Sequence, residues 1–158
     1  MKSIVAGLVV WLVSVPVAFA QSPVSESAPR SEAVPEITVY KSPTCGCCKK
    51  WISHLRQNGF HVVAQDVISM GPVKQKYAVP QMLRSCHTAV VNGYVIEGHV
   101  PAADIRRLLK SRPPLWGLAV PGMPIGSPGM EQGNQRQPYG VLSVDRNGQV
   151  DVFSLHNQ

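Results

Sequence analysis

Three cysteines in this chain of 158 residues lie within four consecutive positions, at Cys45, Cys47 and Cys48. They stand between a strand-like run and a helix-like run, so they are expected at the N-terminus of a helix. The helix dipole and the free amide groups there lower the pKa of a thiol and favour the thiolate. Thiolates attack disulfides and bind soft metal ions. The cluster therefore predicts redox chemistry or metal binding.

The spacing within the cluster separates these two chemistries. Cys45 and Cys48 can meet across the first helical turn, which makes them candidates for dithiol–disulfide exchange. Cys47 would compete for that disulfide, whereas an additional thiolate is an asset in a Cu(I) site. Zinc is less suited, because its four tetrahedral ligands commonly come from two separated pairs. A purely structural Cys45–Cys48 bridge would close too small a loop to stabilise the fold much.

The fourth sulfur belongs to Cys86, which lies directly before a predicted strand in the sequence SCHT, residues 85–88. In thioredoxin-like folds, the loop that enters this strand faces the Cys-x-x-Cys pair and usually carries a cis-proline. Cys86 would then lie beside the other three cysteines. The alternative is that Cys86 packs as a small buried hydrophobe, as free cysteines often do.

Further donors are available near these positions. His87 is a candidate ligand because it adjoins Cys86, and His99 is a candidate because it stands where a strand leads into a helix. Met123 and Met130 could supply thioethers to copper, although loop methionines also cover apolar surface.

The elements that position these residues follow from the apolar periodicity. Strands are predicted at residues 36–40, 60–67, 88–91 and 94–97, the last two as a hairpin around Asn92-Gly93. Helices are predicted from Cys47, from Gly71 and from Pro101. The order β-α-β-α-β-β-α, with the cysteines opening the first helix, predicts an α/β, thioredoxin-like fold with a parallel, right-handed first unit.

The chain after this core has a different composition. Residues 113–138 are rich in Pro, Gly and Met, and we expect a long loop without regular structure. Residues 139–153 alternate around a turn and predict an added C-terminal β-hairpin. Residues 36–158 are thus expected to form a single metal-binding domain.

The N-terminus predicts export from the cytoplasm. Lys2, an apolar run over residues 4–19 and the sequence AFA at 18–20 indicate a signal peptide of residues 1–20. The alternative, a membrane anchor, would need about 20 apolar residues. Residues 21–35 have the composition of a flexible leader. We therefore predict a periplasmic protein that is not attached to the membrane after cleavage.

The charge argues against one class of partner. Removing residues 1–20 takes away Lys2 and no acidic residue, so the net charge falls from +6 to +5. The basic residues are scattered along the sequence. They are not interleaved with aromatic residues, as is typical of proteins that bind single-stranded nucleic acids, so nucleic-acid binding is not expected.

Four segments resemble one protein family: KSPTCGCC (41–48), SCHT (85–88), EGHVP (97–101) and GMPIGSPGM (122–130). It is the CopG-like family of periplasmic proteins, long described as a domain of unknown function and found in copper-resistance gene clusters. The resemblance spans residues 37–153. It implies a thioredoxin-like fold, a role in copper tolerance and an interconversion of Cu(I) and Cu(II). By position, it implies that the copper ligands are Cys45, Cys47, Cys48 and Cys86. Residues 41–48 are also similar to glutaredoxin-like arsenate reductases, over the first β-α unit only.

The leading hypothesis is therefore a periplasmic copper-binding protein of copper resistance that holds Cu(I) in a thiolate cluster and can interconvert Cu(I) and Cu(II) as a copper oxidoreductase. Two alternatives stay open. One is a thiol–disulfide oxidoreductase that acts on protein disulfides, and the other is a copper metallochaperone. The partners implied are copper ions together with a copper exporter or a periplasmic redox protein.

Overall fold

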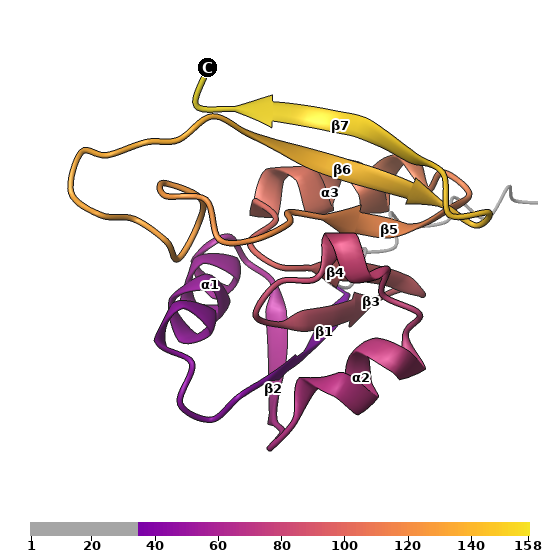
Figure 1. The fold of residues 1–158 in the computed structure, drawn as a ribbon, viewed down its shortest axis with the longest axis horizontal. Coiled ribbons are helices and arrows are strands. Elements are labelled where there is room, and N and C mark those ends of the chain that lie inside the picture. Colours follow the sequence, from indigo (N-terminus) through magenta and orange to yellow (C-terminus); the bar gives the residue numbers. More distant parts are fainter. Residues whose placement is uncertain (1–34) are drawn as a thin grey trace, which may run out of the picture. The chain divides into compact units, whose positions relative to one another are not determined.

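The computed structural model describes residues 35–158, so the expected signal peptide and all but the last residue of the expected leader lie outside it. The described part forms a seven-stranded sheet with three α-helices and one short 3₁₀ helix (Figure 1). The elements are β1 (Glu36–Lys41), α1 (Gly46–Gln57), β2 (His61–Asp66), α2 (Met70–Lys76), the 3₁₀ helix (Gln81–Leu83), β3 (Thr88–Val91), β4 (Tyr94–Glu97), α3 (Ala102–Ser111), β5 (Leu115–Ala119), β6 (Tyr139–Asp145) and β7 (Val150–His156).

The sheet has the strand order β2-β1-β3-β4-β5-β6-β7. Strands β1 and β2 are parallel and joined through α1, while β3 and β4 form an antiparallel hairpin. Asn92 and Gly93 both have positive φ, 46° and 81°, as a two-residue hairpin turn requires. The α/β, thioredoxin-like prediction is confirmed, including the C-terminal hairpin, in which β6 and β7 extend the sheet beyond β5.

The expectation that residues 113–138 lack regular structure is wrong for residues 115–119, which form β5. This strand lies parallel to β4 and antiparallel to β6. Its central residue is Gly117, where an added Cβ would lie 1.8 Å from the carbonyl oxygen of Val95. The close approach of the two backbones therefore requires glycine at this position. A short apolar run that contains glycine and is flanked by prolines lacks the sequence pattern of a strand, so β5 was not predicted. The remaining segment, residues 120–138, has turns and one isolated bridge between Gln132 and Gln135. We call it the covering loop.

The core fixes α1 against the rest of the fold. Its buried stripe, Cys48, Trp51, Ile52 and Leu55, follows helical spacing. Except for Cys48, these side chains share one apolar cluster with residues of β1, β3, β4 and α3. The indole nitrogen of Trp51 also donates to the carbonyl oxygen of Val100, at 2.9 Å. The N-terminal half of α1 is thereby held beside the connection between β4 and α3. Within residues 35–158, none of the helices combines the length and the apolar composition that crossing a bilayer demands.

Candidate metal centre

The cysteine motif lies at the start of α1. Cys45 is the N-cap residue, in extended conformation, and Cys47 and Cys48 belong to the first turn. No acidic residue lies in that turn and no side chain caps it. The positive end of the helix dipole and its free amide groups therefore face the sulfurs without a competing carboxylate, which favours thiolates.

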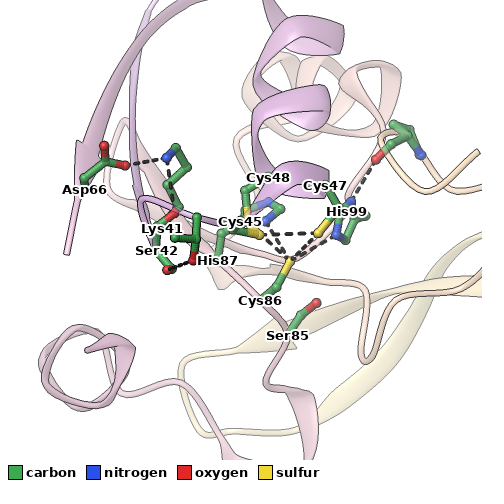
Figure 2. The surroundings of a disulfide bond; sticks show 12 residues. Lys41, Ser42, Cys45, Cys47, Cys48, Asp66, Ser85, Cys86, His87 and His99 are labelled. Carbon is green, nitrogen blue, oxygen red and sulfur yellow. Dashed lines mark hydrogen bonds and ion pairs between the residues drawn. A yellow bond between two sulfur atoms is a disulfide. The ribbon is translucent and has the colours of Figure 1, made fainter. Parts of the chain in front are cut away.

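Four sulfurs converge at this helix end, as Figure 2 shows. Cys45 and Cys48 form a disulfide. The Sγ atom of Cys47 lies 3.4 Å from that of Cys45. The Sγ atom of Cys86 lies 3.6 Å from that of Cys48 and 3.8 Å from that of Cys47. The expected approach of Cys86 to the motif is therefore present. We call Cys45, Cys47, Cys48 and Cys86 the sulfur cluster.

Both candidate histidines also reach the cluster. Cys86 Sγ lies 3.2 Å from Nδ1 of His87 and 3.1 Å from Nε2 of His99. Nδ1 of His99 lies 2.8 Å from the carbonyl oxygen of Pro128. A carbonyl can only accept a hydrogen bond, so Nδ1 carries the proton and Nε2 turns its lone pair toward Cys86. Metal-binding histidines are commonly held in this way, by a carbonyl on the nitrogen that faces away from the metal.

His87 is held differently. Its side chain is completely buried, and its ring centroid lies 4.3 Å from that of Trp51. Among the described residues, its Nε2 atom is the buried side-chain polar atom without a hydrogen-bond partner. Such an atom calls for an explanation, and an ion or a water molecule is a common one.

Burial sets the protonation of these groups. It lowers the pKa of His87 well below its ordinary value, with further contributions from His99 and Lys74, and it lowers the pKa of His99 as well. Both rings are therefore neutral at pH 7, which is the form that binds metals. Burial, followed by the nearby Cys47 thiol, raises the pKa of Cys86 to about 12.

These donors fit copper. They fall into two overlapping groups, in each of which the ligand atoms lie within 4.8 Å of one another: the sulfur cluster, and Cys86 with His87 and His99. Neither group contains a carboxylate. Thiolates favour Cu(I) and imidazoles accept copper in either oxidation state, whereas the hard cations Mg²⁺ and Ca²⁺ need oxygen ligands.

The covering loop packs directly on the motif. Gly129 has φ +88°, and an added Cβ there would lie 2.8 Å from the carbonyl oxygen of Cys47 and from the amide nitrogen of Trp51. Only glycine lets the loop approach this closely. Met123 is half-exposed, and Met130 is partly buried. The two thioethers are associated with the site through their position on the covering loop.

A buried ion pair supports the Cys86 segment, and the sequence reasoning missed it. The Glu97 side chain is completely buried and 2.5 Å from Lys74 Nζ. It accepts hydrogen bonds from the Ser85 amide and the Thr88 hydroxyl, both at 2.6 Å. These two residues flank Cys86 and His87, so Glu97 fixes both ends of the ligand-bearing dipeptide. The sequence signal that could have indicated this ion pair is Glu97 itself, a single charged residue at the end of the apolar strand YVIE. We call Lys74, Ser85, Thr88 and Glu97 the Glu97 network.

The raised pKa of Cys86 predicts slow modification of this thiol in the metal-free protein. Because the thiolate is the nucleophile, alkylation by iodoacetamide should accelerate about tenfold per pH unit up to about pH 11. Quenched reactions analysed by peptide mass spectrometry measure the rate at this residue. In urea the same thiol should level off near its ordinary pKa, about 8.5. A plateau below about pH 9 in the folded chain would contradict the assignment.

Comparisons with known proteins identify the family of this chain. The family model described as "Protein of unknown function, DUF411" matches residues 83–130. Comparison with curated proteins gives no match. Two solved structures, named copper resistance protein CopG form 2 and form 1, are each 47% identical to this chain. They cover 78% of it and are themselves covered over 99% and 98% of their lengths, with TM-scores of 0.76 and 0.74. At this identity, over essentially the whole of both relatives, the chain belongs to the CopG-like copper-resistance family.

Proposed function

We propose that this protein binds copper and holds Cu(I) through Cys45, Cys47, Cys48 and Cys86. The observation that carries the proposal is the meeting of four sulfurs from two segments, with Cys48 and Cys86 separated by 38 positions in the chain. Sulfur at this density selects a soft monovalent ion and can bridge several of them. The solved relatives named copper resistance proteins support the choice of copper.

His87 and His99 are proposed as further ligands because they contact the sulfur cluster, and the thioethers of Met123 and Met130 are proposed as weaker candidates. His99 has the stronger case of the two histidines, because the Pro128 carbonyl orients its free nitrogen toward Cys86.

We further propose that the site interconverts Cu(I) and Cu(II), with Cys45 and Cys48 as the redox pair. When these two thiols join in a disulfide they release two protons to solvent and two electrons. Two Cu(II) ions accept one electron each and become Cu(I). The Cys45–Cys48 bridge supports this proposal, because it shows that these two sulfurs lie close enough to join.

Residues 1–20 support a periplasmic location for the processed chain. Copper exported from the periplasm must be delivered to an exporter, and oxidised cysteines must be reduced again. A copper exporter or a periplasmic dithiol protein is therefore the proposed partner.

The test is the copper content of the reduced chain. Residues 21–158, fully reduced under nitrogen, are titrated with Cu(I) against a strong Cu(I) chelator. We expect at least one copper ion to be retained per chain, with thiolate-to-copper absorbance in the near ultraviolet. Less than one copper ion per chain would defeat the proposal.

A thiol–disulfide oxidoreductase is the second candidate function, and the Cys45–Cys48 disulfide favours it. Replacing Cys47 with serine separates the two functions. Disulfide exchange needs only the Cys45–Cys48 pair and should survive, whereas copper stoichiometry or affinity should fall. Reduction of a model protein disulfide and the Cu(I) competition assay, run on the same preparation, give the answer.

A further inference from the structure

The net charge of the described chain is concentrated on two helices. Together with the residue that ends α3, α1 and α3 carry seven basic side chains and one acidic side chain. The rest of residues 35–158 carries six basic and six acidic side chains, so it is neutral when histidine is counted as neutral. The seven basic residues are all exposed, and we call them the basic face: Lys49, Lys50, Arg56, Arg106, Arg107, Lys110 and Arg112.

Both helices lie on the same side of the sheet. Strand β1 buries Val39 in the apolar cluster that α1 and α3 share. The next residue, Tyr40, points to the opposite side, where its hydroxyl oxygen lies 3.0 Å from that of Tyr77 at the end of α2. The chain that leaves α1 also meets α3, because the Arg106 guanidinium lies 5.0 Å from the centre of the Phe60 ring. Basic residues that are scattered along the sequence therefore gather on one surface.

The acidic groups that adjoin this surface are already engaged. Asp104 of α3 is buried and accepts hydrogen bonds from the Ser154 hydroxyl at 2.8 Å and from Arg107 at 3.2 Å. Glu131 of the covering loop lies beside α1 and accepts from the Gly129 amide at 2.8 Å. Two acidic groups cannot cancel seven cations, so the basic face keeps a positive potential.

Two arginines of the basic face are held in place by the protein. Nη2 of Arg56 donates to the carbonyl oxygen of Val62 at 3.0 Å, and the Arg106 guanidinium lies over the Phe60 ring. A guanidinium has five N–H donors, and these contacts leave most of them available. Guanidinium groups that are already positioned bind carboxylates in pairs of hydrogen bonds and lose little conformational freedom in doing so.

The surroundings of the basic face favour a folded partner over a lipid surface. Helices that lie on a membrane insert large apolar side chains into it. Among residues 35–158, the exposed side chains of this kind all lie outside α1 and α3, at Ile68, Met82, Met123, Val152 and Leu155. A recess of about 340 Å³ beside α1 can instead receive a polar side chain, since it is lined by Lys50, Ser53, His54, Gln57 and Glu131. A second copy of this chain would present like charges, which repel.

We propose that the basic face is a docking surface for a protein that presents a cluster of Asp and Glu side chains. Oppositely charged patches steer two proteins together and set their relative orientation. Lys49 directly follows Cys48, so a partner bound here lies beside the start of α1. The inference goes beyond the proposed copper function and does not depend on it, because neither the basic face nor its test involves a metal.

The test compares two triple variants of the processed chain, residues 21–158, that remove equal charge from different surfaces. The first removes three cations from the basic face: Arg56→Gln, Arg106→Gln and Lys110→Gln. The matched control removes two arginines and one lysine that are exposed and lie outside α1 and α3: Arg84→Gln, Arg146→Gln and Lys76→Gln. The control also matches the local contacts, because Arg84 donates to a carbonyl oxygen and Lys76 lies over a tyrosine ring.

The probe is a fluorescent oligoglutamate peptide, and its binding is followed by fluorescence anisotropy. We expect the parent chain to bind the peptide at low salt and to release it toward about 1 M salt, where the Debye length is about 3 Å. An exposed ion pair contributes a factor of about 1.4 to 5 in affinity, so the basic-face variant should bind at least about fivefold more weakly. The control variant should bind like the parent.

Equal weakening in both triple variants would attribute binding to net charge and would overturn the proposal. It would also be overturned if the parent did not bind the peptide in a salt-sensitive way. Binding to vesicles of phosphatidylethanolamine and phosphatidylglycerol, without binding to the peptide, would assign the face to lipid instead. Circular dichroism identifies a variant that fails to fold. In that case Lys49→Gln/Lys110→Gln, which changes two exposed lysines, should weaken peptide binding by at least about twofold.

Discussion

Replacing Glu97 with glutamine is expected to lower the free energy of unfolding by about 3 to 5 kcal/mol, the usual effect of removing one partner of a buried ion pair. The Lys74 side chain is 8% exposed and that of Glu97 is 0% exposed, so the remaining ammonium group would lack a counter-charge and water. Glutamine also offers one acceptor oxygen where the carboxylate accepts from three donors. Urea unfolding followed by circular dichroism measures the change.

The Glu97→Gln/Lys74→Met double variant distinguishes charge isolation from the loss of hydrogen bonds. If the unpaired ammonium group causes most of the effect, the double variant should recover most of the lost stability. Asp151→Asn, on an exposed residue of β7, is the matched control and should stay within about 0.5 kcal/mol of the parent. A loss below about 1 kcal/mol for Glu97→Gln would show that the pair does not support the fold.

Replacing Cys86 with serine is expected to weaken Cu(I) retention by at least about 100-fold. Loss of an outer contact to a metal ligand alone weakens binding about 10- to 100-fold, and Cys86 is proposed as a ligand itself. A hydroxyl oxygen is a hard donor and a poor substitute for sulfur at Cu(I). Competition with a Cu(I) chelator at fixed pH measures the affinity.

The pH dependence of this loss is a second readout. Binding copper displaces the proton of a thiol whose pKa is raised to about 12, so parent affinity should rise with pH through the neutral range. Serine does not release such a proton on binding, so Cu(I) affinity should rise less steeply with pH in the Cys86→Ser variant than in the parent. Met82→Leu, which removes the thioether of a residue that is 79% exposed, should leave both the affinity and its pH dependence unchanged. Equal affinities for Cys86→Ser and the parent would exclude Cys86 as a ligand.

Local patterns account for the parts of the molecule that the sequence predicted. The hairpin over residues 88–97 and the helix that follows the cysteine motif depend on nearby residues, through turn chemistry and apolar spacing. The approach of Cys86 required the fold as well, and the thioredoxin-like plan supplied it. Gly117 shows the limit of such reasoning, because its strand exists through a backbone contact that leaves no side-chain signature.

The supporting contacts of the metal centre could not be predicted for a different reason. Thr88 and Glu97 are cross-strand partners, so their contact depends on the register of β3 and β4. Lys74 comes from α2, and the carbonyl that orients His99 comes from a residue 29 positions further along the chain. Such pairings arise only when the tertiary structure assembles, and no periodicity in the sequence encodes them.

The partner of His99 is a main-chain oxygen, and substitution cannot delete a main-chain oxygen. Replacing the side chain at position 128 leaves the acceptor in place, so a scan of single substitutions would overlook it. Substitutions at the next position should have the larger effect, because no residue other than glycine at position 129 preserves the approach of the loop to α1. The genetic signature of this imidazole contact should therefore be an intolerant glycine next to a tolerant proline.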